Sequence, residues 1–363
     1  MKRLYFLLCA LIAIPAVFAS DIVVVDAEDA NPVVAASVFS KSGVIFGMTD
    51  SDGRLTGLSE NDYPIVVRCL GYSDAECNAQ TDTVRLCTSA IELAGLVVTP
   101  ADRPVTRVLC YIREYSGVAN AKDTVQIFSE HMADYYIATQ KVKKFKSHKT
   151  PRVLGSLQYA RRKSSDGRDS IYRPDYRGDD VSWLDLLTLP DNRVEESEAV
   201  RMGARTDTVN GKYCVKKIVR KTDNMYVESI DYLADTKDHK LSPMMFKLLG
   251  FTMDFNDLYT SWAYMPNDGG KYSITDLIYG TMSTRVLGRG KWIKRAFNSD
   301  TPVEINGLFE VYPVEIEHLT VEEAREQLDN PPAVQMRRSP NALPLPAATQ
   351  RLVEAFNAQS ASK

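Results

Sequence analysis

The first residues whose types and spacing could do chemistry are the carboxylates within residues 47–55, GMTDSDGRL. Their D-x-D-G spacing suits a calcium loop, a catalytic pair of carboxylates or a sharp turn. An EF-type loop that begins at Asp50 would put Arg54 in a ligand position and Asn61 where a bidentate Glu is required, so the calcium pattern fails. Adjacent acids in a turn face solvent, which leaves them without the surroundings that tune catalytic carboxylates. We therefore interpret the stretch as a turn in which Asp side chains bond nearby amides and Gly53 supplies a positive φ.

Acid–base candidates beyond this stretch are few. His131 follows Glu130 in an expected helix, where a lone His beside a Glu is more typical of a surface residue than of a general base. The chain has no G-x-S-x-G elbow, H-E-x-x-H pair, complete phosphate loop or Cys-His signature, and GRGK at residues 288–291 fits a turn. Distant Asp or Glu residues could still converge in the fold as a glycosidase pair. The sequence therefore predicts no catalytic residue and no cofactor, and it leaves convergent carboxylates open.

Metal and disulfide chemistry would depend on the five cysteines that follow the predicted leader: Cys69, Cys77, Cys87, Cys110 and Cys214. They form no C-x-x-C pair. The four histidines lack zinc-ligand spacing; they are His131, His148, His239 and His318. One disulfide among the first three cysteines fits an oxidising compartment, but the spacing does not identify the pair, and buried free thiols fit equally well. We predict no metal site and leave the disulfide pairing open.

Aromatic residues are dense between Tyr226 and Tyr264. Tyr and Trp suit ligand-binding surfaces because they combine a large apolar area with a polar group, although most such residues belong to cores. Trp262 is the single candidate for a ligand-binding residue, since it falls in an expected loop after Asn256 and Asp257. Its ring is expected either to cap the core or to contact a partner.

The N-terminus predicts export. Lys2 and Arg3 precede an apolar run, residues 4–19, that ends in small side chains at the positions a signal peptidase reads, with cleavage before Ser20. No cysteine stands at the cleavage point, so we expect no lipid anchor. No other segment has the length and apolarity of a membrane helix. We expect a periplasmic or outer-membrane-associated protein.

Short runs rich in β-branched residues follow the leader at residues 22–25, 33–39, 44–46, 65–70 and 83–86. Asn-Pro, Ser-Gly, Asp-Gly and Tyr-Pro pairs separate them. This spacing predicts a small all-β sandwich.

The same region resembles a known family. The shared elements are VD at residues 25–26, NPVVAASV at 31–38, GMTDSDGRL at 47–55, CLGY at 69–72 and LAGLVV at 93–98. Together they resemble the carboxypeptidase-regulatory-like module of Bacteroidetes envelope proteins over residues 21–98. The resemblance implies a non-catalytic, transthyretin-like Greek-key sandwich. The chain departs from the family pattern at Ala35, Leu55 and Gly95.

The rest of the chain mixes helix and strand patterns. Helices are expected at residues 102–117, 121–146, 242–250, 320–328 and 347–358. Strands are expected at residues 153–161, 212–221, 225–233 and 302–316, with the second and third joined as a hairpin. Residues 163–178 fit an exposed loop, and residues 330–346, with five prolines, fit a linker or extended tail. This order predicts an α+β domain in which helices cover one face of a mainly antiparallel sheet.

Four segments result: a signal peptide at 1–19, a β-sandwich at 20–98, an α+β domain at 99–329 and a Pro-rich tail with a short helix at 330–363. The net charge of −3 lacks the positive footprint of a nucleic-acid-binding protein. Our leading hypothesis is a non-enzymatic cell-envelope protein with a sandwich interaction module and a second domain that binds a partner, a glycan or a peptide. The alternative is an exported hydrolase acting on glycan or peptide, with the sandwich as an accessory domain.

Overall fold

The computed structural model describes residues 20–361 except 90–101, 121, 140–141, 143–144, 176–181, 191–192, 197–199, 201–205, 211–214, 223, 235, 237–239 and 245–249. The predicted leader lies outside the described residues. The described part is mostly β, with mainly antiparallel sheets and few helices.

The strands of the first unit are β1 (Ser20–Asp26), β2 (Ser37–Ser40), β3 (Ile45–Met48), β4 (Arg54–Leu58), β5 (Ile65–Arg68), β6 (Ala75–Cys77) and β7 (Thr83–Leu86). Those of the second are β8 (Val105–Ala119), β9 (Asp123–Ala138), β10 (His148–Ser164), β11 (Asp169–Tyr172), β12 (Arg193–Glu195), β13 (Thr206–Asn210), β14 (Lys216–Lys221), β15 (Tyr226–Asp231), β16 (Phe251–Tyr264), β17 (Lys271–Ser273), β18 (Leu277–Gly290) and β19 (Val303–Leu319). The described helices are η1 (Glu60–Asp62), η2 (Leu184–Leu186), η4 (Ile274–Asp276), α4 (Lys291–Ala296), α5 (Val321–Asp329) and α6 (Ala347–Ala361).

The first unit is built from two small sheets, one in the order β4-β1-β7 and one in the order β3-β2-β5-β6. Alternating apolar side chains of both sheets point inward and form one buried cluster, which includes Ile22, Val38 and Val67. The predicted all-β character of this region is therefore correct.

The turn between β3 and β4 has the predicted construction. Asp50 accepts hydrogen bonds on Oδ1 from the backbone amides of Asp52 at 2.8 Å and Arg54 at 2.9 Å. Gly53 has a φ of 69°, and a Cβ atom there would lie 2.5 Å from the carbonyl oxygen of Val24. The carboxylate of Asp50 is thus a structural acceptor within the turn.

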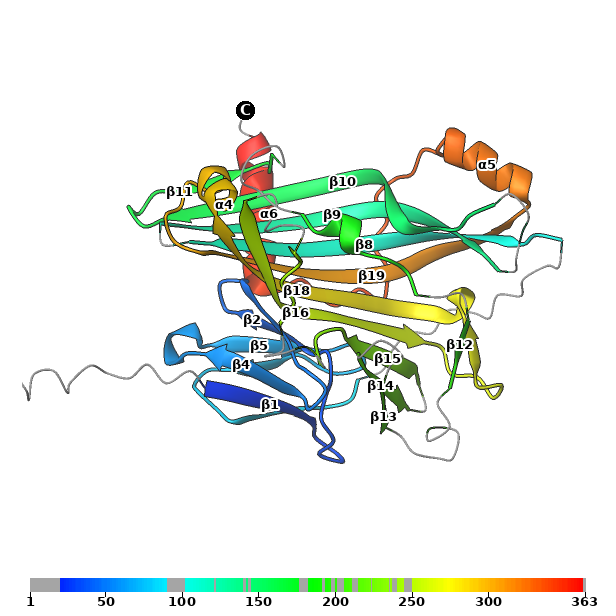
Figure 1. Cartoon of the computed structure of the whole chain (residues 1–363), viewed down its shortest axis with the longest axis horizontal. Coiled ribbons are helices and arrows are strands. Elements are labelled where there is room, and N and C mark those ends of the chain that lie inside the picture. The colour runs from blue at the N-terminus through cyan, green and yellow to red at the C-terminus, as the bar shows by residue number, and fades with distance from the viewer. Residues whose placement is uncertain are drawn as a thin grey trace, which may run out of the picture.

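The second unit is dominated by one ten-stranded sheet in the order β11-β10-β9-β8-β19-β18-β16-β15-β14-β13. All of its pairings are antiparallel, and its central strands are long and lie side by side across the molecule (Figure 1). The small unit lies against one face of this sheet, where β3 packs on β8, β18 and β19.

Two of the helices predicted from the sequence are strands in the structure. Residues 102–117 and 121–146 were expected to be helical, but they form the paired strands β8 and β9. Nearly every side chain of both strands is buried, because the sheet is covered on both faces. Apolar residues therefore occur on both sides of each strand, and the period of two that identifies a half-exposed strand is lost.

Different segments cover the two faces. The face toward the small unit packs against it and against residues 330–346, which we call the strap, in clusters that join Leu70, Leu109 and Leu343. The opposite face packs against the segment from Leu184 to Val200. The strap was expected to be a linker or tail, but it connects α5 to α6 while lying on the sheet.

Other expectations from the sequence are correct. Strands β10, β14, β15 and β19 lie where they were expected, and β14 and β15 form the predicted hairpin. The capping box at Thr320 is present, since its amide donates to Glu323 Oε2 at 2.8 Å and its Oγ1 accepts from the Glu323 amide at 3.2 Å. The final helix also forms, as α6.

Two further regions need comment. Residues 163–178 were expected to be an exposed loop, but Asp169–Tyr172 forms strand β11 and pairs with the end of β10. Most of the helix expected at residues 242–250 lies outside the described residues.

We predict that Gly53→Val lowers the free energy of unfolding by more than about 1 kcal/mol, because the new side chain meets both the positive φ and the Val24 carbonyl. Asp52→Asn should cost less than about 0.5 kcal/mol, since only the amide of residue 52 is used by the turn. Urea unfolding of the two variants tests this.

Calcium provides the control for the turn. It should leave the melting temperature of the protein unchanged. A calcium-dependent rise that Asp50→Ala abolishes would contradict the structural role of this turn.

Candidate functional site

A groove opens between the strap, helix α6 and the sheet beneath them. Its volume is about 570 Å³, within the roughly 300–1,000 Å³ typical of ligand pockets. It is lined by Arg113, Arg338, Ser339, Ala342, Leu343, Pro344, Leu345, Gln350, Val353, Glu354 and Asn357. The groove therefore combines a cationic part with apolar and amide-bearing walls.

Three elements position these side chains. Strand β8 holds Arg113 on the face that the strap crosses, and the strap supplies Arg338 to Leu345. Helix α6 packs on β10 and β11, where Phe356 meets the ring of Tyr159 edge-on at 5.1 Å between centroids. Leu352 is buried beneath the helix. The exposed Gln350 and Asn357 on this helix thus form one wall.

Buried charges lie beside the groove. Arg113, only 4% exposed, donates from Nε to Tyr111 Oη at 3.0 Å, from Nη1 to Glu310 Oε2 at 3.4 Å, and to the carbonyl of Leu343. Tyr111 donates in turn to Glu130. Arg338 binds Glu130 with Nε at 2.8 Å and Nη2 at 3.0 Å. This network, which we call the arginine cluster, joins three strands of the sheet, β8, β9 and β19, to the strap.

The environment of the arginine cluster keeps Arg113 charged. Burial by itself would lower the pKa of the Arg113 guanidinium, but the neighbouring Tyr115 and Glu310 outweigh it, so the pKa is raised. Burial also raises the pKa of Tyr111, so this phenol keeps its proton and remains a donor. Arg113 therefore remains a cation beside the groove, where it is paired with Glu310.

A third arginine, Arg68, connects the small unit to the strap. Arg68 of β5 is 1% exposed, donates from Nε to Asp74 Oδ2 at 3.0 Å, and donates from Nη2 to the carbonyl of Pro344 in the strap. Its Nη1 is buried without a hydrogen-bond partner among the described residues. Because Pro344 lines the groove, the small unit, the strap and the sheet meet at this site.

A second constellation lies on the opposite face of the sheet. His131 of β9 has Nδ1 2.7 Å from Ser156 Oγ and Nε2 3.4 Å from Glu114 Oε2. Glu114 is fully buried, His131 is 3% exposed and Ser156 is half-buried. The order Ser, His, Glu resembles the proton relay of serine hydrolases, but the two imidazole nitrogens are exchanged, because in that relay Nε2 faces the serine and Nδ1 faces the carboxylate. The expectation that His131 is a surface residue on a helix is therefore wrong.

The same carboxylate also anchors the covering segment. Glu114 accepts from Ser182 Oγ at 2.9 Å and from the Trp183 amide at 3.3 Å, so it holds residues 182–187 on the sheet. Sequence spacing does not reveal this constellation, because Glu114, His131 and Ser156 come from three different strands. Only the registers of β8 with β9 and of β9 with β10 bring them together.

Trp262 is not in a loop. It lies in β16, is 3% exposed, and belongs to the cluster beneath the segment from Leu184 to Val200. Its ring fills the space above Gly280 of β18, where a Cβ atom would lie 2.0 Å from Cζ3 of the indole. Of the two roles considered for this ring, the structure places it in the core.

Four of the cysteines are described, and all four are free thiols: Cys69, Cys77, Cys87 and Cys110. Burial raises the pKa of the Cys69 thiol to about 11. Cys214 lies outside the described residues. Within the described part of the chain, no group of three or more His, Cys, Asp or Glu side chains is arranged to hold a metal ion.

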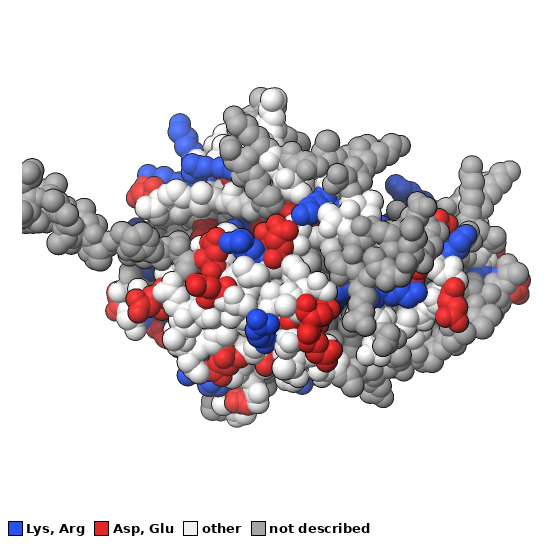
Figure 2. Space-filling model, turned by 90° about the horizontal axis from the view of Figure 1, so that it is seen from below, with Lys and Arg blue, Asp and Glu red and all other residues white. Residues whose placement is uncertain are grey.

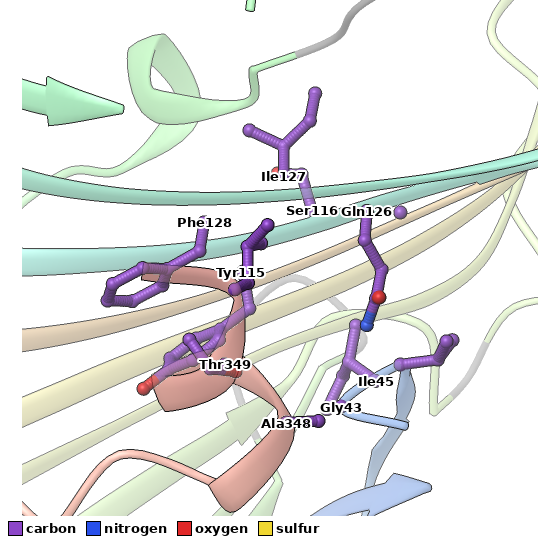
Figure 3. A pocket seen from close by; sticks show the side chains of 12 residues that line it. Gly43, Ile45, Tyr115, Ser116, Gln126, Ile127, Phe128, Ala348 and Thr349 are labelled. Atoms are coloured by element: carbon purple, nitrogen blue, oxygen red, sulfur yellow. The ribbon is translucent and has the colours of Figure 1, made fainter. Parts of the chain in front are cut away.

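A second, much smaller cavity lies where β3, β8 and β9 meet α6 (Figure 3). Gln126 and Ser116 from the sheet, Gly43 from the small unit and Ala348 from α6 line it. Its volume of about 20 Å³ holds no more than one water molecule. It is a packing gap between the two units and not a ligand site.

On the face seen in Figure 2, acidic and basic side chains are intermixed. No helix in the described residues is long and apolar enough to cross a membrane.

Comparison with known proteins adds little. No protein-family model matches the chain, and no curated protein matches it either. Among solved structures, the chain is similar to one titled "Lipid-protein interactions in lipovitellin", at 12% sequence identity and a TM-score of 0.29. The match covers 65% of this chain and 26% of that one, so it spans about a quarter of the lipovitellin chain. Similarity at this level supports no conclusion about fold or function.

The contact between Trp262 and Gly280 predicts a specific cost of substitution. Gly280→Ala should lower the free energy of unfolding by about 1–3 kcal/mol, because the new methyl group overlaps the indole. Trp262→Ala should lower it by about 3–5 kcal/mol. Gly155→Ala is the matched control, since a Cβ atom at this strand glycine of β10 meets nothing within 4 Å. Equal urea midpoints for Gly280→Ala and Gly155→Ala would show that the indole of Trp262 is not packed against Gly280.

Proposed function

We propose that this chain is an exported, non-enzymatic cell-envelope protein that binds a partner in the groove beside the arginine cluster. In this proposal residues 1–19 are a signal peptide and residues 20–98 are a carboxypeptidase-regulatory-like module with a Greek-key topology. The module serves as an interaction domain, and the sheet with its strap forms the binding domain.

The observation that carries the proposal is the groove itself. It is much larger than the cavity beside Gly43 and lies where the strap, the sheet and α6 meet. Arg113 places a buried cation at its base, and Leu345 and Val353 provide apolar walls. Sites of this kind, apolar with a few convergent polar groups, are typical of binding.

The module assignment draws support from local structure. The Asp50–Gly53 turn, which lies within the stretch that resembles the family, has the side-chain acceptor and the positive φ expected of a tight turn between strands. The two small sheets share one buried cluster, as in a sandwich.

A second candidate function is an exported hydrolase acting on peptide or glycan, and the Glu114-His131-Ser156 constellation favours it. Ser156 would be the nucleophile, His131 would accept its proton, and Glu114 would orient the imidazole. The leading proposal ranks above it because Glu114 already has a structural task in holding residues 182–187.

The binding function is tested by capture from envelope fractions with the full-length protein as bait. Gln350→Trp fills the groove and should abolish recovery of a reproducibly identified partner. Gln359→Trp is the matched control, because this exposed glutamine lies on the same helix outside the groove, and it should leave recovery unchanged. Recovery of nothing by the wild-type bait would contradict the proposal.

The hydrolase candidate is tested with a fluorophosphonate probe, which labels activated serines. We expect no labelling of Ser156 under conditions that label a serine-hydrolase standard. Labelling of Ser156 that is lost in a folded His131→Gln variant would overturn the non-enzymatic proposal. Melting curves confirm that the variant is folded.

A further inference from the structure

We propose that the groove binds the free carboxyl terminus of a partner polypeptide, with an apolar side chain at its last residue. This inference rests on the proposed function and names the part of the partner that is recognised. The binding residues are Arg338 and Arg113, with α6 as the facing wall.

Unused hydrogen-bond donors at the groove argue for an anionic group. Arg338 uses Nε and Nη2 on Glu130, which leaves Nη1 without a partner among the described residues. Arg113 uses Nε and Nη1, so its Nη2 has no hydrogen bond within the described chain. Both arginines line the groove. Two such donors from different arginines suit the two oxygens of a carboxylate.

Each arginine at the groove is paired with a carboxylate: Arg68 with Asp74, Arg113 with Glu310, and Arg338 with Glu130. These pairs balance in charge, so an incoming carboxylate would be held by the unused N–H donors of Arg113 and Arg338 and not by a surplus positive charge.

The walls distinguish a peptide from a fatty acid. Ser339, Gln350 and Asn357 bring a hydroxyl and two amides to the lining. An acyl chain would remove water from these polar groups without offering them any new hydrogen bond, which is costly. A peptide main chain offers amides and carbonyls to them, while Leu345 and Val353 accept its last side chain.

One acidic residue in the lining restricts the ligand further. Glu354 lies on the exposed side of α6 and accepts from Gln350 Nε2 at 2.9 Å. A second negative charge on the ligand near α6 would be repelled by this carboxylate. The preferred terminus therefore has an apolar last residue and no acidic residue beside it.

The test uses fluorescence anisotropy with the full-length protein. The probe is a pool of fluorescein-labelled hexapeptides that end in Leu and are randomised at the other positions. One half of the pool keeps a free carboxylate and the other half is amidated. We expect the free pool to bind at least about tenfold more tightly than the amidated pool, as for the loss of one charged hydrogen bond.

Variants of two neighbouring arginines test the role of Arg338. Arg338→Gln should weaken binding of the free pool by at least about tenfold and leave the amidated pool unchanged. Arg337→Gln is the matched control, because Arg337 has similar exposure and binds Glu315 and the Val314 carbonyl instead. It should leave both pools unchanged. The comparison of the pools uses the wild-type protein and so does not depend on how the variants fold.

Several results would overturn the inference. They are equal binding of the two pools, equal effects of the two arginine variants, no binding of the free pool below about 1 mM, and tighter binding of decanoate than of the free pool. If any of these occurs while the wild-type protein still captures a partner and Gln350→Trp does not, the proposed function stands and only this inference fails.

Discussion

Burial of both faces of one long antiparallel sheet is the constraint on which the rest of this structure depends. A sheet of this width exposes two apolar faces, and each must be covered before the chain is stable. The small unit, the strap and α6 cover one face, and the segment from Leu184 to Val200 covers the other. The elements outside the sheet are thus best understood as covers whose contacts hold them in place.

The covers are fixed at their junctions by buried polar groups. Arg68 reaches the strap from the small unit, Arg113 reaches it from the sheet, and Glu114 anchors the segment on the opposite face. Buried charges cost roughly several kcal/mol each to desolvate and are offset only where partners are well placed. A cover that shifted would leave these groups unpaired, so they select one arrangement where apolar packing alone would tolerate several.

The groove follows from the same arrangement. The strap crosses the sheet and turns into α6, and the space between them is closed at its base by Arg113. Because the small unit contributes Arg68 to the strap carbonyl at Pro344, a partner bound in the groove would contact a surface that all three covers shape. Partner binding and the contact between the two units therefore occur at the same site. This connects the interaction module with the binding domain in the proposed function.

The sequence alone determined five features through short-range interactions. They are the β character of residues 20–89, the Asp50–Gly53 turn, the β14–β15 hairpin, the Thr320 capping box and α6. These depend on residues close together in the chain, whose preferences are expressed before any distant contact forms. The sequence could not reveal that β8 and β9 are strands, because burial on both faces removed the alternation that identifies them. Nor could it place Trp262 over Gly280, assemble Glu114 with His131 and Ser156, or join Arg113 to the strap across more than two hundred residues. Those contacts depend on strand register and on the path of the strap, which only the tertiary structure decides.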